Sequence, residues 1–154
     1  MKTKIHAFAG ALALLTICIF WGATAITELF GDASAIAAVK NGILAGMLVL
    51  VLSMAIAGAS GFSLGKGWRS PAVARKKLRM KIIAANGVLV LVPSAVFLAG
   101  KAGAGEFDMT FAAVQAIELI AGAVNITLLS LNMRDGLALR RKPARPTGAK
   151  TLLA

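Results

Sequence analysis

Residues 110–129 read "TFAAVQAIELIAGAVNITLL", an apolar stretch whose only charged side chain is Glu118. A helix rises about 1.5 Å per residue, so about 20 residues cross the roughly 30 Å hydrocarbon layer of a bilayer. Glu118 follows Met109 by nine residues, or roughly 13 Å along a helix axis. This segment therefore predicts a membrane-spanning helix with a carboxylate near the middle of the layer.

The composition of the whole chain agrees with a membrane protein. Of 154 residues, 58% are hydrophobic and 15% are charged, and the mean hydropathy is +0.83. Ordinary soluble domains have roughly 45–50% apolar and 25% charged residues. Uncharged runs of spanning length occur three more times, so we predict an all-α membrane protein with spans at about 7–27, 36–60, 82–100 and 109–133.

Short connections between the spans predict one domain, an antiparallel up-down four-helix bundle over residues 1–133. A basic loop at 62–81 joins the second and third spans, and a basic tail follows at 134–154. Ser34 is the expected N-cap of the second span. Ser70 and Pro71 predict a helix start that leads into the third span, where Pro93 predicts a kink.

Positive charge is concentrated at one set of helix ends. The net charge is +11, while the opposite set of helix ends holds only two basic residues, Lys40 and Lys101. The residues that most strongly predict the topology are Arg75, Lys76, Lys77, Arg79 and Lys81. By the positive-inside rule both termini and the middle loop are cytoplasmic, in the inner (plasma) membrane of a bacterial-type cell. The charge therefore indicates contact with anionic lipid headgroups rather than nucleic acid.

The N-terminus has a second interpretation. Residues 1–25 have the basic start, apolar stretch and small residues of a cleavable signal peptide. The apolar stretch is longer than usual for such peptides, and Trp21 lies close to the cut. We favour an uncleaved first span.

The polar residues of the last span form one helical stripe with spacings of three, four and three: Gln115, Glu118, Gly122 and Asn125. This face is expected to point at the other helices. An unpaired carboxylate there costs at least about 2.5 kcal/mol, so Glu118 needs protonation or a partner. By depth, the candidate partners are Asn41, Lys40 and Thr24, whereas Asn86 matches Asn125. Lys40 is otherwise expected to extend outward along the helix surface.

Small residues recur every four positions in the second span, at Ala38, Gly42 and Gly46. Such faces, with Gly122 in the fourth span, allow helices to approach closely in lipid. The pattern fits packing within the chain and dimerisation equally well.

Chemical motifs are scarce. Motifs for nucleotide binding, zinc binding or a nucleophile elbow are absent, and we expect no enzymatic activity. His6 is the only histidine, and together with Met80 or Met133 it could bind haem or Cu(I). At the level of the bundle the chain resembles small four-helix proteins of bacterial inner membranes, including the cytochrome b and copper-resistance types, but it lacks their histidine pairs. We therefore carry over no site residues and expect no cofactor or metal.

Three functional hypotheses follow. The first is an accessory, assembly or scaffold subunit of a membrane complex, bound to other membrane subunits or to copies of itself. The second is a small oligomeric transporter or channel coupled to protons or cations through Glu118. The third is a redox protein with haem or copper at His6.

Overall fold

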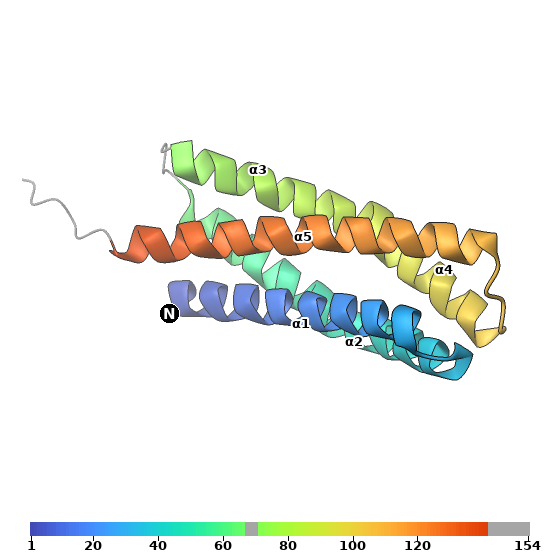
Figure 1. Cartoon of the computed structure of the whole chain (residues 1–154). Helices are drawn as coiled ribbons and strands as arrows, with labels where there is room; N and C mark the ends of the chain where they lie inside the picture. The colour runs from blue at the N-terminus through green and yellow to red at the C-terminus, as the bar shows by residue number, and fades with distance from the viewer. Residues whose placement is uncertain (67–70, 142–154) are drawn as a thin grey trace, which may run out of the picture.

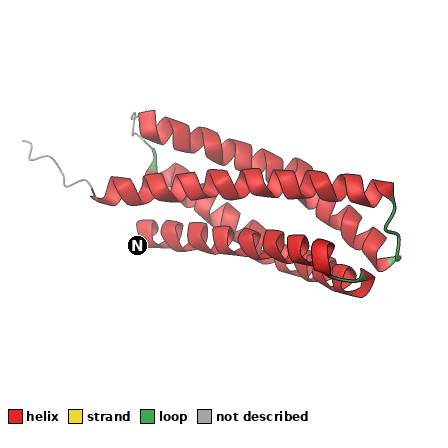
Figure 2. Cartoon of the chain, viewed as in Figure 1, coloured by secondary structure: helices red, strands yellow, loops and turns green. Residues whose placement is uncertain are grey.

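The computed structural model describes residues 1–66 and 71–141, and its regular elements are all helices, as Figure 2 shows. Their bounds are α1 (Lys2–Phe30), α2 (Ala33–Leu64), α3 (Pro71–Asn86), the π-helical turn η1 (Gly87–Leu91), α4 (Val92–Gly103) and α5 (Met109–Arg141). Four helical stretches of the described chain are long and apolar enough to cross a membrane: Thr3–Phe30, Ala33–Leu64, Val73–Gly103 and Met109–Ala138. Each predicted span lies wholly inside one of them.

The connections lie at two ends of the helix bundle (Figure 1). The turns from α1 to α2 and from α4 to α5 lie at one end, and the N-terminus, the end of α2, the start of α3 and the end of α5 lie at the other. Around the bundle, α1 packs on α2, α2 on α4, α4 on α5, and α5 on α1. Within the described residues no Cα atom of α2 lies within 8 Å of one in α5. These two helices therefore face each other across the diagonal.

Aspartate side chains cap the N-terminal ends of α2 and α5. The Asp32 carboxylate accepts hydrogen bonds from the backbone N–H of Ala35 and the hydroxyl of Ser34, both at 2.8 Å. The predicted cap at Ser34 is therefore wrong, because the cap is Asp32, two residues earlier, and the Ser34 hydroxyl donates to the Asp32 carboxylate. These bonds lower the pKa of Asp32, chiefly through the Ala35 N–H.

Asp108 has the same role before α5. Its carboxylate accepts from the Phe111 N–H at 2.9 Å and from the Thr110 hydroxyl at 2.7 Å. The Lys101 ammonium lies 2.6 Å away and is the largest cause of the lowered pKa of Asp108, followed by these two hydrogen bonds. The α4–α5 turn is thus held by an ion pair and a cap.

Pro93 is accommodated by a change of helix type. It is the second residue of α4 and follows η1, in which the N–H of Val92 donates to the carbonyl of Gly87, five residues earlier. Proline has no N–H and its ring clashes with the carbonyl four residues back. The wider π turn before Pro93 absorbs both effects, so α3, η1 and α4 continue as one spanning stretch.

Helices extend further into the basic regions than the predicted boundaries. α2 ends at Leu64 and α3 begins at Pro71, so most of the predicted loop at 62–81 is helical; Ser70 lies outside the described residues. α5 continues eight residues past 133 to Arg141, and the Arg79 guanidinium binds the Asp135 carboxylate of this extension at 2.7 Å. The rest of the predicted tail, 142–154, also lies outside the described residues.

Glycines receive large side chains of α1. A Cβ atom added at Gly46 would lie 2.7 Å from Cζ of Phe20, and one at Gly122 would lie 2.9 Å from Cδ1 of Trp21. A Cβ at either position would collide with these rings. Gly46 and Gly122 are therefore used for packing inside the chain.

Candidate functional site

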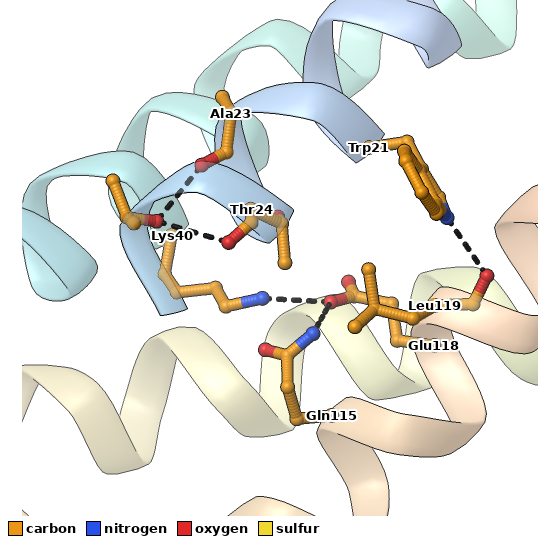
Figure 3. A network of polar contacts seen from close by, with 8 residues as sticks. Trp21, Ala23, Thr24, Lys40, Gln115, Glu118 and Leu119 are labelled. Carbon is orange, nitrogen blue, oxygen red and sulfur yellow. Dashed lines mark hydrogen bonds and ion pairs between the residues drawn. The ribbon is translucent and has the colours of Figure 1, made fainter. Parts of the chain in front are cut away.

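The candidate site is a buried ion pair between α2 and α5. The Lys40 ammonium lies 2.7 Å from Oε2 of Glu118, and Nε2 of Gln115 donates to the same oxygen at 3.2 Å (Figure 3). Only 1% of the Lys40 side chain and 12% of the Glu118 side chain are exposed. Because α2 and α5 are diagonal neighbours, the pair crosses the interior of the bundle.

The capping residues bring these two charges to one level. Lys40 follows the Asp32 cap by eight residues, or about 12 Å of helix, and Glu118 lies about as far from the start of α5. The expectation that Lys40 extends outward is therefore wrong. Its four-carbon stem reaches across the bundle, because a carboxylate at the same depth relieves the cost of burying the ammonium. Lys40 was one of the partners suggested by depth.

Asn41 does not belong to this network, although its depth in the sequence made it a candidate partner of Glu118. Successive helical residues turn by about 100°, so the residue after the buried Lys40 points away from the interior. Asn41 is exposed. Among the described residues its side chain has no hydrogen-bond partner. Thr24, also suggested for Glu118, is 3% exposed and lies beside the pair.

A second polar layer joins α3 to α5. Nδ2 of Asn86 donates to Oδ1 of Asn125 and to the carbonyl of Ala121, both at 2.9 Å. Nδ2 of Asn125 in turn donates to the carbonyl of Ile83 at 3.4 Å. The pairing expected from depth is present, and Asn86 comes directly before the π turn.

The polar layers do not connect into a continuous path. Glu118, Asn125 and Asn132 recur every seven residues on α5, which is roughly 10 Å per step, whereas one hydrogen bond spans about 3 Å. Asn132 is 5% exposed, and both of its side-chain polar atoms lack partners within the described chain. Residues 1–66 and 71–141 thus hold separate polar sites rather than a hydrogen-bonded wire.

A cavity of about 60 Å³ lies next to the ion pair. Its walls are mostly apolar, and Glu118 and Thr24 supply polar groups. Lys40 and Gln115 both bind Oε2 of Glu118, whereas Oε1 of this carboxylate has no hydrogen-bond partner in the described part of the chain. The cavity is large enough to hold water molecules.

Trp21 covers one side of this cavity. Its indole N–H donates to the carbonyl of Leu119 at 2.9 Å, one residue from Glu118, while the ring rests on Gly122. Sequence reasoning missed this contact. The only sequence pattern that could have indicated it was an aromatic residue and a glycine at similar depth in two spans. Many residue pairs in an apolar chain fit this pattern.

His6 contacts α2 at the end of the bundle that holds the N-terminus. Its Nδ1 lies 3.0 Å from the carbonyl of Ala57 and 3.1 Å from the hydroxyl of Ser60. Met80 packs with the core cluster around Ile83, and Met133 is 44% exposed. In the described ranges no group of three or more His, Cys, Asp or Glu side chains could hold a metal ion.

The basic residues expected to set the topology lie on α3, at the end that also holds the N-terminus (Figure 1). They are Arg75, Lys76, Lys77, Arg79 and Lys81. Besides the pair of Arg79 with Asp135, Lys77 donates to the carbonyl of Gly65 at 3.1 Å. The opposite end carries the Lys101 ion pairs with Glu106 and Asp108.

Comparison with known proteins found no matching family model, no similar curated protein and no similar solved structure. The geometry of the chain itself is therefore the basis for inferring its function.

Proposed function

We propose that this chain is an accessory, assembly or scaffold subunit of a complex in the inner (plasma) membrane of a bacterial-type cell. Its four helices cross the bilayer as an antiparallel up-down bundle, with both termini and the α2–α3 connection in the cytoplasm. The placement of basic side chains at one end of the bundle supports this orientation.

The Lys40–Glu118 ion pair is the observation that carries the proposal. An ionisable group inside a membrane is by default a candidate for transport or catalysis. Here the two charges neutralise each other at 2.7 Å, and Gln115 supplies a further hydrogen bond. The charged groups are thus used to join α2 and α5, which leaves the outer helix surfaces as the place where the protein acts.

Those outer surfaces are apolar over most of their area. Large side chains point outward from every spanning helix, among them Phe8, Leu48, Leu89 and Ile120. Lipid chains or the helices of other membrane proteins are the natural contacts of such surfaces. A scaffold or assembly role needs this kind of surface and no catalytic group.

Purification from native membranes in mild detergent, followed by mass spectrometry, tests the role. We expect one or more membrane proteins to copurify in a fixed ratio to this chain. Recovery of this chain without any other membrane protein, in a detergent that preserves a known complex of the same membrane, would contradict the accessory role.

Cysteine labelling tests the orientation separately. In a Cys18→Ser background, Arg75→Cys should react with a membrane-impermeant maleimide only after the cells are permeabilised. Ala104→Cys, in the α4–α5 turn, should react in intact cells. The reverse pattern would overturn the proposed topology.

Translocation of protons or cations is a second candidate function, favoured by the cavity beside Glu118 and the unpaired Oε1 atom. It predicts that Glu118→Gln abolishes pH-dependent uptake by vesicles reconstituted with the protein. Equal uptake by the variant and the original protein would rule out a role for this carboxylate.

A further inference from the structure

The outward face of α2 combines small residues with an unpaired amide. Ala38, Asn41, Gly42 and Ala45 are all exposed on this face. A Cβ added at Gly42 would meet no atom within 4 Å, in contrast to Gly46, which packs against Phe20. The small residues of α2 thus serve two surfaces, one inside the chain and one outside.

Asn41 is in an unfavourable position for a monomer in a membrane. It follows Lys40 directly and so lies at the level of the buried ion pair, about 12 Å from the start of α2. Its side-chain amide has no hydrogen-bond partner among the described residues and points outward. Lipid chains cannot form hydrogen bonds, so a polar group of another chain at this depth would stabilise the amide.

The exposed side of α2 includes two series of positions seven residues apart, although it is wider than these series, because residues 44, 49, 51 and 56 are exposed as well. Residues 38, 45, 52 and 59 are exposed, as are 41, 48 and 55 between them. From 38 to 59 this face extends for roughly 32 Å, enough to cross the hydrocarbon layer. A repeat of seven keeps one face of a helix against another along a left-handed pair, and in a parallel pair each position meets its own copy.

We infer that α2 forms the interface of a two-fold symmetric dimer of this chain, in which the two Asn41 amides hydrogen-bond to each other. An amide is both donor and acceptor, so two copies satisfy each other without any other partner. The Asn side chain is short, and Gly42 with its small neighbours lets the helices approach to the 8–10 Å at which two such side chains meet. This inference rests on the membrane-spanning arrangement proposed above.

Disulfide cross-linking in native membranes tests the interface. In the Cys18→Ser background, Ala45→Cys should form a covalent dimer on mild oxidation. Ile120→Cys, which is exposed on α5 at a similar depth, is the matched control and should stay monomeric. Cross-linking of Ala45→Cys no faster than Ile120→Cys would overturn the dimer.

Substitutions at the interface test the role of the amide. By sedimentation equilibrium of the purified protein in detergent micelles, Asn41→Val should weaken dimerisation about tenfold, and Gly42→Leu should abolish it. Gly100→Leu, which also meets no atom within 4 Å but lies on α4, should have no effect. A dimer of unchanged affinity in Asn41→Val would refute the amide pair.

These experiments distinguish this inference from the proposed function. The dimer is measured on the purified protein, whereas the accessory role is measured by copurification of different proteins. Copurifying proteins without an Ala45→Cys dimer would leave the accessory role standing and overturn the dimer. An Ala45→Cys dimer without any copurifying protein would support the dimer and contradict the accessory role.

Discussion

Removing one charge of the Lys40–Glu118 pair should destabilise the bundle strongly, whereas removing both should not. Two unit charges 2.7 Å apart attract each other by roughly 6 kcal/mol at an effective dielectric constant of about 20. Burying the ammonium and burying the carboxylate each cost several kcal/mol of desolvation free energy, and the attraction between the two charges offsets this cost. A single substitution leaves the other charge buried without this compensation, at a typical cost of about 3–5 kcal/mol.

The structure also predicts which single variant is worse. Glu118→Leu leaves the ammonium of Lys40, whose side chain is only 1% exposed in the original protein, without a hydrogen-bond partner in the described chain, so its cost should lie near the upper limit. Lys40→Met leaves a carboxylate that is 12% exposed and still accepts from Gln115, so its cost should be smaller. The double variant should lie within about 1 kcal/mol of the original protein, because apolar side chains of similar volume replace the pair.

Titration from mild detergent micelles into SDS, followed by far-UV circular dichroism, measures these free energies of unfolding. The coupling energy is the sum of the two single effects minus the effect of the double variant. We expect at least about 5 kcal/mol. Additivity within about 0.5 kcal/mol would refute the reasoning, because it would mean that the two charges do not interact inside the bundle.

Three further predictions use other contacts of the bundle. Gly46→Leu should lower the stability in the same titration by about 1–3 kcal/mol because Phe20 occupies the space, whereas Gly42→Leu should not destabilise the monomer; equal effects would contradict the division of α2 into two surfaces. Trp21→Phe should cost about 1 kcal/mol through loss of its hydrogen bond, and an unchanged unfolding midpoint would show that this bond contributes nothing. The pKa of the Asp108 carboxyl is lowered in the folded state, so this carboxylate contributes fully to stability above its unfolded-state pKa near 3.8, and the contribution is lost as the pH falls through the folded-state pKa. Asp108→Asn should remove this part of the acid sensitivity. Unfolding midpoints measured between pH 2 and 6 for both proteins would show the difference.

The helical class and the spans could be predicted from the sequence because they depend on local composition. A run of about 20 apolar residues must satisfy its backbone hydrogen bonds within the helix in lipid, whatever the rest of the chain does. Periodicity on α5 likewise indicated the buried side: Gln115, Asn125 and Asn132 are all at most 5% exposed. The expected depths of Asn86 and Asn125 in the membrane were enough to predict that these two side chains pair.

The ends of the elements were less predictable. Ser34 and Asp32 are both good capping residues, and the choice depends on which carboxylate or hydroxyl reaches the first free N–H groups. The extension of α5 to Arg141 depends in part on the contact of Asp135 with Arg79, a residue 56 positions earlier in the chain. Local patterns do not contain such contacts.

The sequence by itself determined that this chain has four apolar helices, where a carboxylate lies within the last one, and which face of that helix is polar. Each of these features follows from the hydrophobicity of neighbouring residues and from the helical period of 3.6 residues per turn. Only the tertiary structure decided that Lys40 turns inward to meet Glu118 while Asn41 turns outward, and that Gly46 holds Phe20 while Gly42 stays open. Adjacent helical residues differ by about 100° in direction, and the rotation of a helix about its axis is set by packing against its neighbours. In this chain that rotation separates a closed polar interior from the outer face of α2.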